Sequence, residues 1–282
     1  MSRYWSLDDI EWGGFRPDLV DGEMLAVVKA AALVEANAPD YVQYLCNVFK
    51  TDAALCEALE QWGREEEQHG DALARWAAMA DPTFDFERAL SVFRSDFEQV
   101  PLDTEESIRG SRLGELFARC VVESGTTSFY AAMEDKTDEP VLKQIARNIS
   151  ADEVRHYKLF RRQLDDYEGQ EPPLSKLARC RILADRVAER NDDEFGFAYY
   201  AANIALKSDE PYDRDYCMLA YELGSFGIYK QPHLEKAAKM MLRAIGFRSD
   251  SLISRGATRL AWWMVQRRQR EIFQLAEGLK SA

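Results

Sequence analysis

The sequence predicts an all-α protein, built as a four-helix bundle followed by additional C-terminal helices. Apolar residues recur at helical spacing through long stretches in which glycine and proline are rare, and no run alternates as a half-buried strand would. Of the 282 residues, 46% are hydrophobic, which is enough for a substantial core. The longest unbroken apolar runs, such as 30–34, are far shorter than the roughly 20 residues that a membrane span needs.

Four long helices are expected in the first part of the chain, with the ranges 22–49, 52–80, 105–135 and 139–167. Thr51 is suited to cap the second helix, and Thr137 with Pro140 gives the fourth a cap and an early proline. Pro39 lies inside the first range. It removes the backbone hydrogen bond to the carbonyl of Glu35 and is expected to kink the helix there, a break into a loop being the alternative.

The remaining segments are expected to be helical as well. Residues 81–103 contain two prolines and are long enough for a crossover that carries some helix of its own. Five further helices are predicted at 174–190, 195–207, 212–229, 232–245 and 251–279. Because the linker at Pro172 and Pro173 is short, residues 171–282 are expected to pack on residues 1–170, which form an N-terminal arm and the bundle.

Composition excludes several classes of function. The five cysteines are scattered and form no C-x-x-C pair, which indicates reduced thiols in the cytoplasm and no built-in rubredoxin or zinc ribbon. The first residues lack the positive region and apolar core of a secretory signal. A net charge of -13 argues against nucleic acid as a partner, and the basic residues 267–270 are interpreted as a solvated helix face.

Two of the three histidines follow a glutamate by three residues, as Glu66 with His69 and Glu153 with His156. Positions i and i+3 share a helix face, so each pair presents a carboxylate and an imidazole in one direction. One such pair arises readily by chance on a surface. Two pairs match the arrangement that di-iron bundles use, together with one further glutamate from each of two other helices.

Hairpin geometry selects the further glutamates. A helical hairpin returns a residue to the same depth only when the turn lies midway between the two ligands. Glu35 and Glu66 have their midpoint in the first predicted turn. Glu123 and Glu153 have theirs in the second. The predicted metal ligands are therefore Glu35, Glu66, His69, Glu123, Glu153 and His156.

Charge balance predicts two metal ions at this site. Four carboxylates that face one another in a core lose hydration and repel, at a cost of many kcal/mol, and two divalent cations neutralise them. Oxygen and imidazole ligands without a thiolate suit iron or manganese, and less often zinc. Two iron ions are the expected cofactor, with mixed manganese and iron as the open alternative.

Residues around the ligands carry weaker signals. Asp152, next to Glu153, is placed to accept the outward N–H of His69, although a solvated aspartate is the alternative. Glu65 is interpreted as surface charge, and Trp263 is expected to pack in the core rather than to line a pocket.

Residues 34–164 resemble the ferritin-like di-iron carboxylate superfamily, and within it the soluble acyl-carrier-protein desaturases. Four segments carry the resemblance: 35–41, 62–71, 123–126 and 149–156. The six ligands are typical of the superfamily. The tryptophan at 62, the Gly-Asp after the first histidine and the Pro-x-Tyr at 39–41 are more specific to the desaturase branch.

The resemblance implies roles for three more residues. Thr126, one turn past Glu123, would help to deliver protons on the oxygen side of the cluster. Trp62 and Asp152 would join His69 in a hydrogen-bonded path by which electrons reach the metals. The implied partners are an external electron donor such as a ferredoxin, an acyl carrier protein or a free lipophilic substrate, and a second copy in a homodimer.

The leading hypothesis is an O2-activating non-haem di-iron oxidase or oxygenase, desaturase-like, that acts on an organic, lipophilic substrate such as a fatty-acyl group. The alternatives are a rubrerythrin-like peroxidase or ferroxidase, and a non-catalytic metal-stabilised helical binding module. The long C-terminal extension favours the first, because extra helices can cover a substrate cavity that a ferroxidase does not need.

Overall fold

The computed structural model describes residues 4–96, 100–189, 193–248 and 252–280, and every regular element in these ranges is a helix. This confirms the all-α class. An N-terminal arm, residues 4–20, contains three short 3-10 helices, η1 (Leu7–Asp9), η2 (Trp12–Gly14) and η3 (Pro17–Leu19). None of the described helices combines the length and the hydropathy that crossing a membrane requires.

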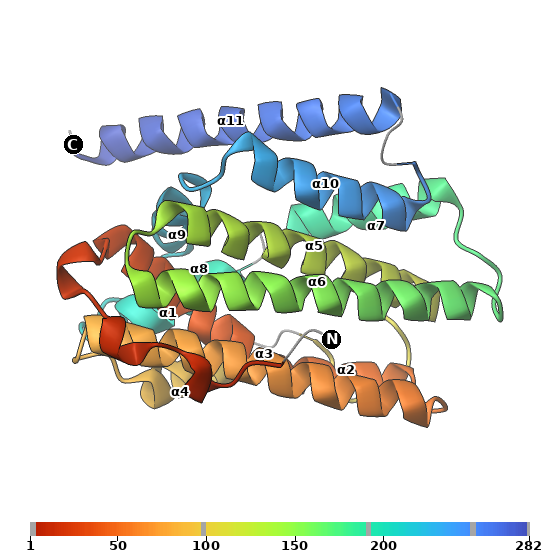
Figure 1. The fold of residues 1–282 in the computed structure, drawn as a ribbon, viewed down its shortest axis with the longest axis horizontal. Helices are drawn as coiled ribbons and strands as arrows, with labels where there is room; N and C mark the ends of the chain where they lie inside the picture. The colour runs from red at the N-terminus through yellow and green to blue at the C-terminus, as the bar shows by residue number, and fades with distance from the viewer. Residues whose placement is uncertain (1–3, 97–99, 190–192, 249–251, 281–282) are drawn as a thin grey trace.

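The first helical hairpin consists of α1 (Gly22–Ala36) and α2 (Ala38–Val48), which follow each other in the chain, and α3 (Ala53–Ala80), which packs against both (Figure 1). The expected single helix over 22–49 is therefore wrong, because it breaks at Asn37. Pro39 occupies the first turn of α2, where its missing N–H costs nothing. Arg94 closes the end of α1 by donating to the carbonyl of Ala36 at 2.8 Å and to the side chain of Asn37.

The caps of this hairpin are aspartates. The side chain of Asp21 accepts from the backbone N–H of Met24, and that of Asp52 accepts from the N–H of Leu55. The cap of α3 is therefore Asp52 rather than the predicted Thr51. Both residues stand in the turn that joins α2 to α3, so the position of the turn agrees with the expectation.

The second hairpin pairs α5 (Arg112–Lys136) with α6 (Pro140–Glu168) through a turn at 137–139. α5 begins seven residues later than expected, after Gly110, whose φ of 77° is left-handed. The fully buried Glu139, rather than the predicted Thr137, caps α6 through the N–H of Leu142 at 2.8 Å. Its carboxylate also accepts from the indole of Trp76 at 2.6 Å and from the backbone of Arg16 at 3.0 Å, so it fastens α3 and the arm to this hairpin.

The predicted crossover contains α4 (Phe86–Asp96). The C-terminal helices are α7 (Lys176–Glu189), α8 (Glu194–Asn203), α9 (Arg214–Phe226), α10 (Gln231–Ile245) and α11 (Leu252–Lys280). α8 and α9 lie against α1, while α7 and α10 lie against α5. α11 runs along the outer edge of the molecule on α9 and α10 (Figure 1). Trp263 on α11 is half exposed, so the expectation that it packs in the core is wrong.

Two apolar cores follow one another along the two hairpins. One contains Leu33, Trp76 and Ile145, and the other contains Phe117 and Phe160. On α3 the core with Phe117 precedes the predicted ligands and the core with Trp76 follows them, whereas on α6 the order is reversed. The predicted ligands therefore lie between two packed apolar layers.

Candidate metal centre

The structure brings the six predicted ligands together. Two overlapping sets of four have ligand atoms within 4.8 Å of one another: Glu35, Glu66, His69 and Glu153, and Glu66, Glu123, Glu153 and His156. We call the six residues the carboxylate–histidine cluster. Glu66 and Glu153, from α3 and α6, belong to both sets. A buried cluster of this composition can hold a metal ion.

The hairpins set the depth of each side chain. Turns at 49–52 and 137–139 lie midway between the paired glutamates, so the ligands return level with each other. Gly70 allows the close approach of α3 to α1 beside the cluster. A Cβ at this position would lie 2.8 Å from the backbone nitrogen of Ala36, so any larger residue would push the helices apart.

Both histidines point Nδ1 into the cluster. Nδ1 of His69 lies 3.4 Å from carboxylate oxygens of Glu66 and Glu153, and Nδ1 of His156 lies 2.9 Å from Glu66. The opposite nitrogen, Nε2, faces a carboxylate outside the cluster. Such a partner keeps the proton on Nε2 and leaves the lone pair of Nδ1 free for a cation.

The two outer carboxylates are Asp152 and Glu65. Asp152 lies 3.2 Å from Nε2 of His69, as expected, and Glu65 lies 2.9 Å from Nε2 of His156. Arg155 bridges both, with 3.0 Å to Glu65. The interpretation of Glu65 as surface charge is therefore wrong. Each outer carboxylate directly precedes a predicted glutamate ligand and serves the histidine of the opposite helix, a relation that depends on how the hairpins face each other.

The tryptophan bonded to Asp152 is Trp5, not the predicted Trp62. The indole of Trp5 donates to Asp152 at 2.7 Å, and its ring lies parallel to that of His69 with the centroids 6.1 Å apart. Trp62 instead packs edge-on against His156, and its buried indole nitrogen finds no hydrogen-bond partner among the described residues. Trp5 lies in the arm, where no periodicity indicated a contact with the cluster.

Two hydroxyl groups bond the carboxylates from α5. Thr126 donates to Glu153, so it lies at the cluster, as the family resemblance implies. Tyr130, which is buried, donates to Glu35. Sequence reasoning missed Tyr130, although the spacing of 123, 126 and 130 places all three residues on one helix face.

The pKa values of the cluster residues are shifted by burial and by the neighbouring charges. Burial raises the pKa of Glu35 and of Glu123 well above the ordinary value, and neighbouring carboxylates such as Glu66 add to this rise. Burial alone would lower the pKa of His156, but Glu66 and Glu65 raise it to about 10. Without cations, the cluster therefore retains protons on carboxyl and imidazole groups at neutral pH.

Hydrogen bonding within the cluster is also incomplete. Among the described residues, Nδ1 of His69, Nδ1 of His156 and one oxygen each of Glu123 and Glu153 are buried without a hydrogen-bond partner. Buried polar atoms in native proteins are rarely left so. Imidazole and carboxylate atoms that converge in this way could hold a metal ion.

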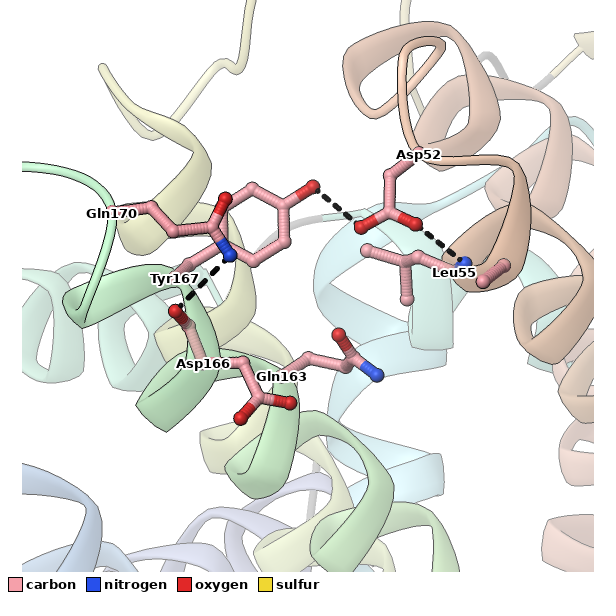
Figure 2. A pocket seen from close by; sticks show the side chains of 7 residues that line it. Asp52, Leu55, Gln163, Asp166, Tyr167 and Gln170 are labelled. Atoms are coloured by element: carbon pink, nitrogen blue, oxygen red, sulfur yellow. Dashed lines mark hydrogen bonds between the residues drawn. The ribbon is translucent and has the colours of Figure 1, made fainter.

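Two clefts lie near the hairpins. The larger, about 390 Å³, is polar and open, and it lies between the α2–α3 turn and the end of α6 (Figure 2). There the hydroxyl of Tyr167 donates to Asp52 at 3.0 Å. Leu55, on its wall, precedes Glu66 by eleven residues, or about 16 Å along the helix, so this cleft is remote from the cluster. The smaller cleft, about 150 Å³, is lined by Trp5 and Asp152 among others and adjoins the cluster.

Comparison with known proteins adds no family assignment. No protein-family model matches this chain, and no curated protein matches it either.

Proposed function

We propose that the chain is a ferritin-like four-helix bundle whose cluster binds two iron ions and activates O2 for the oxidation of an organic substrate. The observation that carries this proposal is the pair of overlapping ligand sets, each with one histidine directed inward and fixed from outside by a carboxylate. Such outer partners are typical of metal-ligating histidines.

The sharing of residues between the two sets supports two ions rather than one. Glu66 and Glu153 would serve both ions, while Glu35 and Glu123 would each serve one. One ion would then have His69 and the other His156. Six protein ligands would be too many for one metal ion that must keep an open position.

Bound iron would supply electrons to O2, and the protein would position the groups around it. The chain from Trp5 through Asp152 to His69 links the arm to the cluster by hydrogen bonds and is the proposed path from an external donor. The hydroxyl of Thr126 holds Glu153 and can pass a proton to its carboxylate. Tyr130 holds Glu35 in the same manner.

The C-terminal helices support a lipophilic, fatty-acyl-like substrate. α8 and α9 cover α1 with aromatic side chains, including the stacked pair Phe195 and Tyr221, whose ring centroids lie 5.1 Å apart. Extra helices of this kind can cover a substrate cavity, which a peroxidase or ferroxidase does not need. A free lipid or an acyl carrier protein is the corresponding partner.

A rubrerythrin-like peroxidase or ferroxidase is the second candidate, and the smaller cleft favours it. This cleft is lined by Arg64, Gln68, Asp152 and Arg155 among others and offers about 150 Å³, which suits peroxide or a hydrated ion better than an acyl chain. The two candidates share the metal cluster and differ in the substrate.

Metal content and oxygen chemistry test the proposal. We expect about two irons per chain, and O2 uptake by the reduced protein in the presence of a lipophilic acceptor. Glu66→Ala and Glu153→Ala should each lose metal, since both residues belong to both ligand sets. Glu67→Ala is the matched control, because Glu67 is exposed on the same turn of α3.

The outcomes separate the candidates. Rapid turnover of hydrogen peroxide without conversion of any lipophilic acceptor would favour the peroxidase. Two metals in Glu66→Ala protein would show that the ligand set is wrong. Binding of zinc alone, with no response to O2, would reduce the cluster to a structural role.

A further inference from the structure

Two cysteines face each other across the turn that joins α2 to α3. Cys46 lies in the last turn of α2 and Cys56 in the first turn of α3, ten residues apart in the chain. Thr51, the midpoint between them, lies in the turn itself, so the hairpin brings the two cysteines level with each other. The same relation brings Glu35 and Glu66 together further along these helices.

Each thiol is directed toward the other residue. The thiol of Cys46 donates to the carbonyl of Cys56 at 3.9 Å, and the thiol of Cys56 lies 3.8 Å from the carbonyl oxygen of Cys46. Phe49, in the turn, offers a second carbonyl oxygen to Cys56 at 3.7 Å. A disulfide forms only between residues whose side chains point toward each other, and these reciprocal contacts meet that condition.

Exposure also distinguishes this pair from the other cysteines. The structure shows all five as free thiols. Cys120 and Cys217 are buried, and Cys180 is exposed on α7. Cys46 and Cys56 are both partly exposed, so a small oxidant in solution can reach them.

We propose that Cys46 and Cys56 are a redox-sensitive pair, which forms a disulfide staple across the α2–α3 turn in the presence of a peroxide or a low-molecular-weight disulfide and is restored by a thiol reductant. The proposal does not depend on the metal chemistry proposed above. Cys56 precedes Glu66 by ten residues, or about 15 Å along α3, and neither cysteine belongs to the carboxylate–histidine cluster.

The two thiols have different roles in the reaction. Burial raises the pKa of Cys46 to about 12, and the adjacent thiol of Cys56 adds to this rise. Cys46 is therefore protonated at neutral pH, and the first attack is assigned to Cys56. The thiolate of Cys56 cleaves the O–O bond of the peroxide, which gives a sulfenic acid and one molecule of water. The sulfur of Cys46 then displaces the hydroxyl group as a second water. Two thiols thereby lose two electrons, and the peroxide accepts them.

The staple should stabilise the first hairpin. It closes a ring of about ten residues, and the resulting loss of chain entropy in the unfolded state lowers the unfolding equilibrium constant about 100-fold. The ring contains Asp52, which caps α3. Under oxidising conditions the bond would therefore hold the end of α2 to the start of α3.

Peptide mapping without reductant tests the proposal, because trypsin cleaves after Lys50, between the two cysteines. The full chain is treated with oxidised glutathione, or with a slight excess of hydrogen peroxide, and is then unfolded while free thiols are blocked. We expect peptides 30–50 and 51–64 to be recovered as one joined species that dithiothreitol separates. Cys46→Ser and Cys56→Ser should each abolish this species. Cys180→Ser is the matched control, since it removes an exposed thiol outside the pair and should leave the joined species in place.

Denaturant unfolding measures the effect of the staple. The oxidised wild-type chain should have an unfolding equilibrium constant about 100-fold smaller than the reduced chain, whereas Cys46→Ser should unfold alike in both conditions. Separate modification of the two thiols, by glutathione or by oxygen, with no joined peptide would overturn the proposal. A joined peptide without any gain in stability would overturn the role as a staple. Metal content does not enter either measurement, so the proposed function is tested separately.

Discussion

Replacement of Glu65 by alanine tests how far the outer carboxylates control the proposed metal site. Oε2 of Glu65 lies 2.9 Å from Nε2 of His156 and 3.0 Å from the guanidinium of Arg155. Glu65 is not one of the six proposed ligands, so the variant leaves every ligand atom in the chain. Any change in metal binding must then act through the orientation and basicity of His156.

The expected magnitude follows from the burial of this pair. Loss of an outer partner commonly lowers metal affinity 10-fold to 100-fold, or about 1.4 to 2.7 kcal/mol. The imidazole of His156 is only 3% exposed, so water cannot readily replace the carboxylate. We therefore expect the upper half of this range. The effect should fall on the ion held by His156, because His69 keeps its own partner, Asp152.

Competition with a chelator measures this difference, using Fe(II) under anaerobic conditions and Mn(II) in parallel. Glu65→Ala should hold one metal normally and release the other early, while Glu67→Ala should behave as wild type. Asp152→Ala should weaken the other ion. Equal affinities in Glu65→Ala and Glu67→Ala would refute the assigned role of Glu65, and equal weakening of both ions would refute the division of ligands.

Three further predictions follow from contacts elsewhere in the molecule. Glu139→Ala should destabilise the fold by about 3 kcal/mol, because a helix cap is lost and the buried indole of Trp76 is left without an acceptor; a denaturation midpoint equal to that of wild type would contradict this. The largely buried Lys29 donates a 2.5 Å hydrogen bond to Asp81 and thereby lowers the pKa of the Asp81 carboxyl. The stability that this carboxylate contributes is therefore present above its unfolded pKa of about 4 and is lost as the pH falls. Asp81→Asn should therefore flatten the acid limb of the stability profile, and an unchanged limb would count against the pair. Trp5→Phe should slow reduction of the loaded protein by an external donor while metal content stays the same; unchanged reduction kinetics would remove Trp5 from the path.

The six residues that meet at the candidate site could be predicted from the sequence, because the spacing of the ligands and the positions of the turns are local features of the chain. A spacing of three residues places Glu66 with His69 on one face, whatever the rest of the fold does. Turns signalled by polar residues and proline then set the depth at which glutamates from neighbouring helices meet. Whether these residues bind metal, and which metal, stays a prediction.

Other features of the site could not be predicted, because they depend on how separate elements pack. Trp5 reaches Asp152 only because the arm crosses the second hairpin, and the arm has no repeating pattern from which this could be deduced. Trp62 has a helical position that allowed several partners, and packing turned its ring toward His156. Glu65 contacts His156 only because the packing of α6 against α3 places that histidine opposite it.

The sequence by itself determined the helical class, the two hairpins and the six residues that meet between them, because periodicity and turn position are properties of the chain alone. Only the tertiary structure decided which carboxylates and which indole support the histidines, and which face of α11 stays uncovered. These choices depend on contacts between residues far apart in the chain, whose energies arise only when the helices pack.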